Sequence, residues 1–430
     1  MNFEEALAYL DEHMSYQKTG RIESPSVEPI TAICAGLGDP HRSAPVIHVT
    51  GTNGKGSTVQ MISSLLAANG LTVGTYTSPH LEHVTERITR NGERISEEEF
   101  GESVGAVAEG APLVGQDPGY FEIVTAAAFR WFADVAVDVM VIEVGLLGRW
   151  DATNVVTSDV AVITNIGMDH QEFAGPTLSD IAREKAGIIE PTGAAVVGET
   201  DPELVEIFRE ASPATMFVRH DDFAATSSTL AVGGRLLDLR TPTTIYPDVF
   251  VPLHGSHQGE NAAVALTAVE TFFAAPLPED VVTEGFGNVV MPGRFEILGR
   301  QPLVIIDGAH NPAGADRCAQ VFFDDFEPEG RRILVCATLR DPEEMLAAFR
   351  ADEFDLVLAA TAPTPRGIPA SDIARVAEAM GCEHVATFDT VDAAVRRAVD
   401  YADGDDAVLV AGSLYTAGAA RGVLRSLLTN

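Results

Sequence analysis

Short runs of apolar residues alternate along the chain with segments whose apolar residues recur at the period of a helix. The runs lie at residues 46–49, 137–144, 160–164, 194–197, 303–306, 333–336, 356–359 and 407–411. Because these runs are short, rich in β-branched residues and separated by helical patterns, we predict an α/β fold with mostly parallel strands.

The pattern changes in two places. Residues 219–251 break into short strand-like pieces with turns such as Gly233-Gly234, which predicts a small antiparallel addition to the parallel sheet. A boundary is expected near Met291-Pro292-Gly293-Arg294, after which a second alternation of strands and helices begins. We therefore predict an N-terminal domain at residues 1–293 and a smaller C-terminal domain at residues 294–430.

The run at residues 46–49 leads into Thr50-Gly51-Thr52-Asn53-Gly54-Lys55-Gly56-Ser57-Thr58, and a helical pattern follows over residues 59–68. A glycine-rich turn between a strand and a helix presents backbone N–H groups and a helix N-terminus to an anion, and Lys55 adds a cation. The glycine spacing differs from that of the common phosphate loop. We interpret the segment as a nucleotide-phosphate site; the alternative is a glycine turn that only joins a strand to a helix.

The composition is strongly acidic. The chain has 63 acidic and 28 basic residues, and its formal net charge of −35 is spread along the whole length. Such a surface repels nucleic acid and anionic membranes, so we expect neither as a partner. Abundant acid with scarce lysine favours a halophilic source, an archaeon, and an acidic mesophilic enzyme is the alternative.

Lysine occurs only at Lys18, Lys55 and Lys185. Its retention at Lys55 supports the phosphate-binding interpretation, because the planar fork of arginine does not fit a narrow phosphate cradle in the same way. Lys185 is either an ion-pair partner or a buried amine whose lowered pKa lets it react with CO₂ to form a carbamate.

The four cysteines lie far apart in the sequence and predict neither a disulfide framework nor a zinc site. The N-terminus reads as an acidic amphipathic helix rather than a secretory signal, and no apolar run approaches the length of a membrane span. We expect a cytoplasmic protein.

Polar residues follow several of the apolar runs. Glu143 ends one run directly before Val144 and Gly145, and a carboxylate at the carboxyl end of a buried parallel strand faces the crevice where α/β proteins bind ligands. Mg²⁺ prefers such oxygen ligands, although a strand-terminal surface acid explains Glu143 equally well. His170 follows the next run and is either a ligand or a structural residue. In the second half, polar residues also follow apolar runs, at Asp307, His310 and Ser413. This pattern predicts that the second half also faces a shared ligand cleft. The alternative is that each residue only caps a helix.

Together these segments resemble the folylpolyglutamate synthase and dihydrofolate synthase family of the Mur ligase superfamily. The resemblance runs in family order over residues 46–418. The matching segments are residues 51–58, 77–81, 86–88, 120–122 with Thr125, 143–145, 151–154, 164–170, 184–188, 257–258 with Asn261, 292–294, 307–312 and 412–415.

The resemblance implies an N-terminal P-loop ATPase domain with a mostly parallel sheet, and a smaller Rossmann-like C-terminal domain. The implied ATP-binding residues are Gly51, Thr52, Asn53, Gly54, Lys55, Gly56, Ser57, Thr58, Asn261, Arg294 and Asp307. The implied Mg²⁺ ligands are Ser57, Ser78, Glu143 and His170. Two Mg²⁺ sites are expected, and K⁺ is a further candidate ion. Lys185 matches the family's carbamylated lysine, and the positions that match substrate-binding residues are Phe121, Asp151, His310 and Ser413.

The implied reaction is ATP-dependent addition of L-glutamate to dihydropteroate, to the glutamyl tail of a reduced folate, or to both, through an acyl phosphate. The implied catalytic residues of this monomeric enzyme are Lys55, Glu143, His170 and Lys185. The alternatives are another amino-acid ligase of the superfamily, against which residues 77–81 and 120–122 argue, and a nucleotide-driven switch without synthetic chemistry.

Two departures from the family pattern concern the pterin pocket. The chain reads Leu147-Gly148-Arg149-Trp150-Asp151 where the family usually has Gly-Gly-Arg-Leu-Asp, and Gly119 stands where a threonine often precedes Tyr120.

Overall fold

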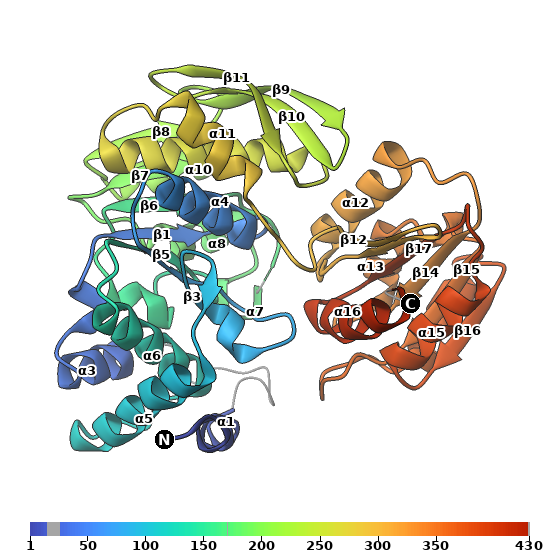
Figure 1. Ribbon diagram of the computed structural model, residues 1–430, viewed down its shortest axis with the longest axis horizontal. Helices are drawn as coiled ribbons and strands as arrows, with labels where there is room; N and C mark the ends of the chain where they lie inside the picture. The colour runs from blue at the N-terminus through green and yellow to red at the C-terminus, as the bar shows by residue number, and fades with distance from the viewer. Residues whose placement is uncertain (15–25, 170, 429–430) are drawn as a thin grey trace. The chain divides into compact units, whose positions relative to one another are not determined.

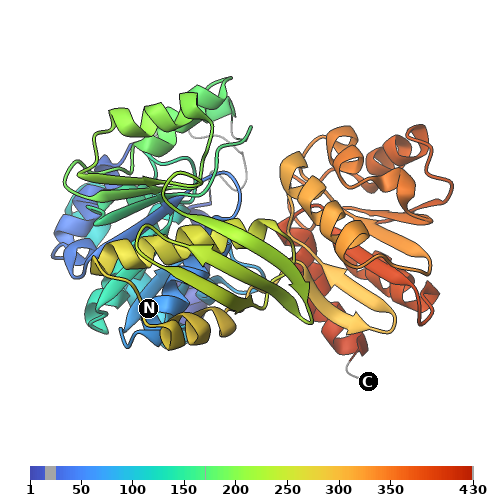
Figure 2. The same cartoon turned by 90° about the horizontal axis from the view of Figure 1, so that it is seen from above.

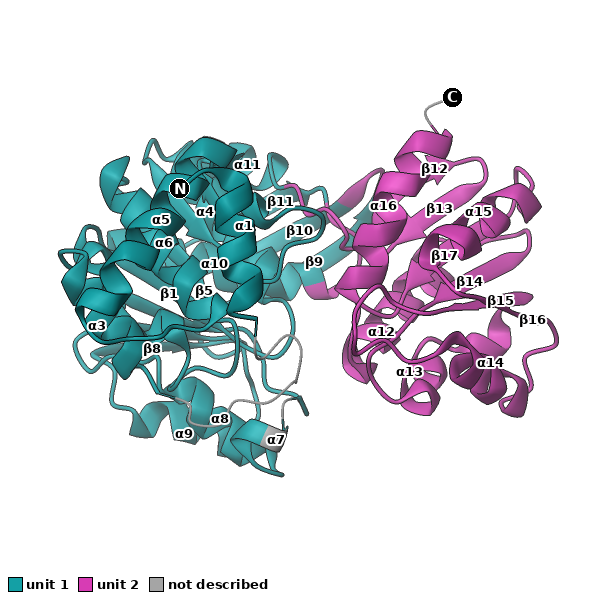
Figure 3. Cartoon of the chain, turned by 90° about the horizontal axis from the view of Figure 1, so that it is seen from below, with its two compact units in different colours: residues 1–231, 235–252, 258–289 teal, residues 232–234, 253–257, 290–430 magenta. Residues whose placement is uncertain are grey.

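The computed structural model describes residues 1–14, 26–169 and 171–428, and the chain divides into two compact units (Figure 3). The first unit comprises residues 1–231, 235–252 and 258–289, and the second comprises residues 232–234, 253–257 and 290–430. Each unit is built on a sheet of mostly parallel strands, as the alternation of apolar runs predicted.

The first unit contains an eight-stranded sheet with the order β4-β3-β2-β5-β1-β6-β7-β8 among the described residues. Six neighbouring strands from β2 to β8 run parallel, and β3 and β4 add antiparallel pairs at one edge. The strands are β1 (Val46–Thr50), β2 (Val73–Tyr76), β3 (Ile88–Arg90), β4 (Glu93–Arg94), β5 (Val139–Glu143), β6 (Val160–Ile163), β7 (Ala194–Val197) and β8 (Thr215–Val218). The fully buried strand β1 lies inside this sheet, so the loop that follows it sits between two other strand ends.

Helices cover both faces of this sheet. Figure 1 shows α4, α10 and α11 above the sheet and α3, α5 and α6 below it. The helices are α1 (Phe3–Glu12), α3 (Glu28–Gly36), α4 (Lys55–Ala68), α5 (Glu97–Leu113), α6 (Tyr120–Asp134), α7 (Gln171–Ala174), α8 (Leu178–Ala186), α9 (Pro202–Glu210), α10 (His257–Phe273) and α11 (Glu279–Gly287). The predicted N-terminal helix is confirmed: α1 begins at a capping box in which Asn2 and Glu5 each accept a hydrogen bond from the other's backbone N–H.

The predicted antiparallel addition is a three-stranded sheet with the order β11-β10-β9. Its strands are β9 (Ala224–Ala231), β10 (Gly234–Arg240) and β11 (Ile245–Val251). This sheet lies beside α10 and α11 (Figure 2). The Tyr246 hydroxyl on β11 lies 2.5 Å from Glu270 Oε1 on α10, and this buried polar contact fixes the sheet against the helix.

Within residues 290–428, the second unit has a six-stranded sheet with the order β12-β13-β17-β14-β15-β16. All neighbours are parallel except β12 and β13. The strands are β12 (Glu296–Arg300), β13 (Leu303–Ile306), β14 (Arg332–Cys336), β15 (Leu356–Ala360), β16 (Val385–Phe388) and β17 (Ala407–Ala411), and the helices are α12 (Pro312–Gln320), α13 (Pro342–Ala348), α14 (Ala370–Ala379), α15 (Val391–Tyr401) and α16 (Leu414–Leu428). A buried cluster that includes Leu334, Phe349 and Leu409 forms the core on one side of this sheet.

Short helical turns complete the chain at Pro40–Arg42, Val84–Arg87, Ala152–Val155, Val321–Asp325 and Ala351–Glu353. All four cysteines are buried free thiols. No helix in the described ranges has both the length and the apolar character needed to traverse a bilayer.

Candidate active site

The loop between β1 and α4 contains two glycines whose conformation excludes other residues. Gly51 has φ 151° and Gly54 has φ 81°, a region of backbone space that favours glycine. A Cβ atom on Gly51 would collide with the Thr164 hydroxyl, and one on Gly54 would lie 2.5 Å from Asn261 Oδ1. The loop therefore fits closely against the end of β6 and the first turns of α10, and Asn261 lies beside Gly54 as part of the same site.

The segment that follows β6 fastens this loop. The N–H of Thr52 donates to the Asn165 carbonyl (2.9 Å), and the N–H of Asn53 donates to Asn165 Oδ1 (3.0 Å). In return, the Asn53 carbonyl accepts from the Thr164 hydroxyl (2.7 Å) and from Asn165 Nδ2 (2.9 Å). The backbone amides of Thr52 and Asn53 are thus engaged by the protein itself.

Helix α4 begins at Lys55, earlier than the predicted start at residue 59. Gly54 occupies the N-cap position in a left-handed conformation, so the chain turns directly into the helix and Ser57 and Thr58 fall in its first turn. The amides of Lys55, Gly56 and Ser57 have no acceptor inside the helix because the first turn lacks preceding carbonyls. These amides, with the positive end of the helix dipole, are the part of the loop suited to an anion.

Two lysines meet at one carbonyl of the loop. Lys55 Nζ donates to the carbonyls of Gly51 (3.0 Å) and Thr52 (3.2 Å), and Lys185 Nζ on α8 donates to the same Gly51 carbonyl at 2.9 Å. Two of the chain's three lysines therefore lie at one point, although they are far apart in the sequence.

The environment of Lys185 favours its neutral form. Its side chain is 4% exposed. Burial lowers the pKa of Lys185 well below its ordinary value, the nearby charge of Lys55 lowers it further, and Asp169 and Asp151 oppose the shift. A neutral amine is the form that reacts with CO₂, so the geometry leaves the carbamate hypothesis for Lys185 in place.

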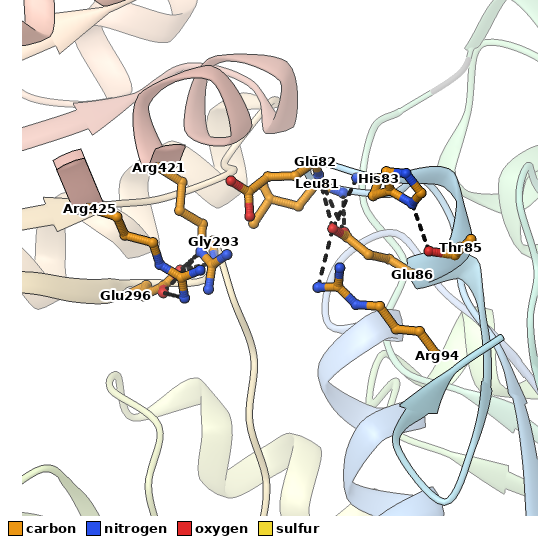
Figure 4. Close-up of polar contacts among 10 residues, drawn as sticks. All are labelled: Leu81, Glu82, His83, Thr85, Glu86, Arg94, Gly293, Glu296, Arg421 and Arg425. Carbon is orange, nitrogen blue, oxygen red and sulfur yellow. Dashed lines mark hydrogen bonds and ion pairs between the residues drawn. The ribbon is translucent and has the colours of Figure 1, made fainter. Parts of the chain in front are cut away.

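Glu143 and Ser78 lie at the carboxyl ends of neighbouring parallel strands, β5 and β2. The Glu143 side chain is buried, and its Oε2 atom accepts a hydrogen bond from the Ser78 N–H at 3.0 Å. The loop after Ser78 is held by Glu86, whose carboxylate accepts from the N–H groups of Leu81 (2.8 Å) and His83 (3.0 Å) and pairs with Arg94 at 3.3 Å (Figure 4).

The donor set around Glu143 fits a magnesium site only if the substrate supplies most of the ligands. Across residues 1–14, 26–169 and 171–428, no three His, Cys, Asp or Glu side chains are grouped as metal ligands. Mg²⁺ is commonly held by one or two carboxylates together with substrate phosphates and water, which the single buried carboxylate of Glu143 beside Ser78 matches. The fourth predicted ligand, His170, lies outside the described residues.

Phe121 and Asp151 lie at the segment that follows Glu143. The Phe121 ring, on α6, packs against Gly145, where a Cβ atom would collide with it. Asp151 is buried, and its carboxylate accepts from the N–H of Leu146 (2.7 Å) and from the N–H (3.0 Å) and hydroxyl (2.5 Å) of Thr153. Burial raises the pKa of Asp151, and these hydrogen bonds oppose the shift. Its carboxylate therefore accepts hydrogen bonds from its own loop at both oxygens and holds that loop in one conformation.

The predicted residues of the second unit gather at one edge of its sheet. Asp307 follows β13, and its carboxylate accepts from the N–H groups of Phe295 and Ala309, both at 2.7 Å. Burial raises the pKa of Asp307, while Arg294 lowers it. His310 Nδ1 lies 3.2 Å from the Gly308 carbonyl, and a Cβ atom on Gly308 would lie 3.0 Å from an Arg294 nitrogen, so these residues form one group. Ser413 follows the adjacent parallel strand β17, and its hydroxyl accepts from the Thr416 N–H at the start of α16 (3.1 Å).

Two residues that hold these groups in place had no predicted role. Asn165, which fastens the loop after β1, lies in the matching segment at residues 164–170 and follows β6 as Glu143 ends β5, so its position at a strand end was an available signal. His48 is a buried imidazole in the middle of an apolar strand, and that interruption was a signal as well.

The sequence and the fold of this chain are similar to those of known ligases. Residues 117–269 match the Mur ligase middle domain, and residues 293–414 match the Mur ligase, glutamate ligase domain. A Mycobacterium tuberculosis protein named dihydrofolate synthase/folylpolyglutamate synthase is 39% identical, over 92% of this chain and 89% of the relative. A Halobacterium salinarum protein named probable bifunctional folylpolyglutamate synthase/dihydropteroate synthase is 34% identical, over 98% of this chain but 51% of that relative.

Solved structures resemble the chain over nearly its whole length. Mycobacterium tuberculosis folylpolyglutamate synthase complexed with ADP has a TM-score of 0.91 and 36% identity, with 98% of each chain covered. E. coli FolC in complex with DHPP and ADP has a TM-score of 0.88 and 30% identity, covering 99% of this chain and 98% of that one. A bifunctional folylpolyglutamate synthase/dihydrofolate synthase with Mn, AMPPNP and L-glutamate bound has a TM-score of 0.85 and 30% identity, with the same coverage. The chain belongs to the dihydrofolate synthase/folylpolyglutamate synthase family of Mur ligases.

Proposed function

We propose that this protein uses ATP to join L-glutamate to dihydropteroate, to the glutamyl tail of a reduced folate, or to both. The observation that carries the proposal is the loop at residues 51–58, which combines conformationally required glycines, a helix N-terminus and Lys55 in one short segment. Relatives with the same architecture are solved with ADP, with AMPPNP and Mn, with DHPP and with L-glutamate, which supports the nucleotide and both substrate classes.

The proposed roles follow the geometry of each group. The phosphates of ATP lie against the first-turn amides of α4 and Lys55, whose ammonium leaves the Gly51 and Thr52 carbonyls to reach them. Further nucleotide contacts are proposed for the other residues of the loop at 51–58 and for Asn261, Arg294 and Asp307. Glu143, Ser78, Ser57 and His170 would hold two Mg²⁺ ions, which when bound offset the charge of the transferring phosphoryl group. Lys185 as a carbamate would place an anion near these ligands.

The chemistry activates an acid that is inert as a free carboxylate. An oxygen of the substrate carboxylate attacks the γ-phosphorus, the bond to the β-phosphate oxygen breaks, and an acyl phosphate and ADP form. The neutral amine of glutamate then attacks the acyl carbon, and the tetrahedral intermediate expels phosphate as the amine loses its proton. Lys55 stabilises the charge on the transferred group, and exclusion of water protects the acyl phosphate.

Further features of the proposal concern the whole protein. Phe121, Asp151, His310 and Ser413 belong to the sites for the two substrates. The functional domains divide at residues 293 and 294, and the enzyme acts as a monomer in a salt-rich cytoplasm, with K⁺ as an additional ion. The acidic composition and the similarity to a Halobacterium relative support the halophilic setting.

Mass analysis of products tests this function. Wild-type protein is given ATP, Mg²⁺, glutamate and high KCl, with dihydropteroate or tetrahydrofolate in separate reactions. We expect addition of one or more glutamyl units to at least one acid, with one ADP for each unit. Turnover of ATP with neither acid present favours a nucleotide-driven switch, and turnover that requires a different acid favours another Mur ligase.

A variant of Lys55 tests whether phosphoryl transfer takes place at the loop of residues 51–58. Lys55→Ala should lower kcat by about 100- to 1,000-fold if its ammonium stabilises the transferring phosphoryl group. Arg130→Ala, which removes an exposed ion pair with Asp134 on α6, is the matched control and should keep wild-type turnover. Near-normal turnover by Lys55→Ala overturns the role of the loop.

A further inference from the structure

Two side chains on one face of strand β1 contact the same neighbouring segment. Side chains alternate along a strand, so His48 and Thr50 point to the same side of the sheet. His48 Nε2 lies 2.9 Å from the Thr153 hydroxyl, and the Thr50 hydroxyl donates to the Leu147 carbonyl at 2.5 Å. Leu147 and Thr153 belong to residues 145–153, which we name the Asp151 loop. Two side chains of the same strand thus hold this loop at separate points.

The contacts from His48 form a hydrogen-bonded chain with one direction. The Thr153 hydroxyl donates its only hydrogen to Asp151 Oδ1, so its oxygen accepts from His48. His48 therefore carries a hydrogen on Nε2, and because burial lowers the pKa of its ring, the imidazole is neutral. Its buried Nδ1 atom has no hydrogen-bond partner among the described residues. Burial of an unpaired nitrogen destabilises the fold, so an apolar side chain would serve packing better, and the bond to Thr153 is what the imidazole adds.

The other side of the Asp151 loop is fastened to α8 and the residues after it. The Arg149 N–H donates to the Glu184 carbonyl (2.9 Å), and Asn154 Nδ2 donates to the carbonyls of Arg149 (3.1 Å) and Gly187 (3.0 Å). The loop starts at Gly145, against which the Phe121 ring packs. Its conformation is thus set by the protein before any acid binds, and such preorganisation increases affinity by reducing the ordering that binding requires.

We propose that His48 and Thr153 are positioning residues for the acceptor acid: through Asp151 they fix the wall of the acid-binding site without touching the acid. The inference rests on the proposed function, which assigns Phe121 and Asp151 to that site. The proposal predicts separate effects on the affinity for ATP and the affinity for the acid. ATP is held by residues 51–58, whereas the acid is held by the wall that His48 shapes. Loss of the chain of hydrogen bonds should therefore weaken binding of the acid and leave binding of ATP unchanged.

Steady-state kinetics of paired variants test the proposal. Thr153→Val removes the hydroxyl at nearly constant volume and should raise KM for the acid about tenfold, with KM for ATP within about twofold of wild type. Thr153→Ser retains the hydroxyl and should restore the KM for the acid. The matched control is Thr267→Val, since Thr267 is equally buried but its hydroxyl donates to the Ala263 carbonyl of its own helix, and both KM values should stay unchanged.

Other readouts keep the test decisive. If Thr153→Val does not fold, His48→Gln, which keeps a donor, and His48→Leu, which does not, should show the same contrast. In ¹⁵N-histidine spectra, the signal lost in His48→Gln should be a neutral ring protonated on Nε2, whereas protonation on Nδ1 overturns the proposal. Equal changes in both KM values, or none in an active enzyme, also overturn it. Wild type that glutamylates neither dihydropteroate nor tetrahydrofolate instead refutes the proposed function on which it rests.

Discussion

Leu147 adopts a backbone conformation that leucine rarely takes. Its φ is 59°, while its side chain is buried and the Thr50 hydroxyl holds its carbonyl. The family resemblance leads us to expect glycine at this position, so the expected departure and the positive φ coincide. The native contacts of Leu147 therefore compensate for a strained backbone.

This strain predicts that glycine at position 147 gives a more stable protein than alanine, the reverse of the usual order inside a helix. Leu147→Gly and Leu147→Ala both remove the buried side chain, but only glycine relieves the positive φ, so Leu147→Gly should be more stable than Leu147→Ala by about 1 kcal/mol. Urea denaturation measures the difference. At Leu66, inside helix α4, the same pair should rank the other way by about 1 kcal/mol. An alanine variant at Leu147 at least as stable as the glycine variant contradicts the strain.

His48 should make stability depend on pH. Burial lowers the pKa of His48 to about 3 from 6.5, so between these values the unfolded chain binds a proton that the folded chain does not. The folded state therefore loses stability as the pH falls through this window. Between about pH 5.5 and 4, wild type should lose about 1.4 kcal/mol per pH unit more than His48→Gln. Urea titrations at several pH values measure this, with Thr267→Val expected to follow wild type. Parallel curves for wild type and His48→Gln would count against a neutral buried ring.

At the scale of elements, helix α16 is joined to strand β12 by an ion pair between the buried Arg421 and the partly buried Glu296. Arg421 Nε lies 2.8 and 3.0 Å from the two carboxylate oxygens of Glu296, which also accepts from the Gly293 N–H (2.7 Å), while Arg425 lies 3.9 Å away (Figure 4). The Arg421 side chain is 6% exposed and that of Arg425 is 56% exposed. The two arginines therefore offer a buried and an exposed partner for the same carboxylate.

Removal of the buried partner should cost far more than removal of the exposed one. Arg421→Met leaves Glu296 charged without its main partner and should lower the unfolding free energy by about 3 kcal/mol. Arg425→Met should change it by less than about 0.5 kcal/mol. Addition of Glu296→Gln to Arg421→Met should recover part of the loss because it removes the uncompensated charge. Calorimetry measures the series, and equal effects of the two arginine variants would show that burial does not decide the outcome.

For the whole molecule, the net charge of −35 sets the response to salt. Repulsion among carboxylates destabilises the compact state, and salt screens it because the Debye length falls from about 10 Å at 0.1 M to about 3 Å at 1 M. The midpoint of thermal unfolding should therefore rise steadily with KCl over this range. Sucrose, which does not screen charge, is the control at matched osmolality. A midpoint that is flat or falls with KCl would contradict adaptation to salt.

The fold was predictable where the pattern of residues is local. The apolar runs at residues 46–49, 303–306 and 407–411 are β1, β13 and β17, and residues 219–251 contain the antiparallel sheet. Strands β2 and β16 were missed because each is a four-residue strand in which small or polar residues interrupt the apolar pattern. The start of α4 was predicted too late. Gly54 adopts a left-handed conformation at the N-cap, so the helix begins at Lys55, and this backbone angle is not apparent from the sequence.

The glycine loop with Lys55 and the acids at strand ends could be read from the amino-acid order, since each depends on neighbours within a few positions. The scarcity of lysine could be read from the composition alone. The contacts that organise the site could not. Lys185 meets the Gly51 carbonyl across 134 positions, and His48 meets Thr153 across 105. Such pairings arise from the order of strands in the sheet and the packing of helices on it, which no local pattern encodes. The sequence by itself therefore determined which chemical groups are present and on which local elements. Only the tertiary structure decided that two lysines share one carbonyl and how the Asp151 loop is oriented.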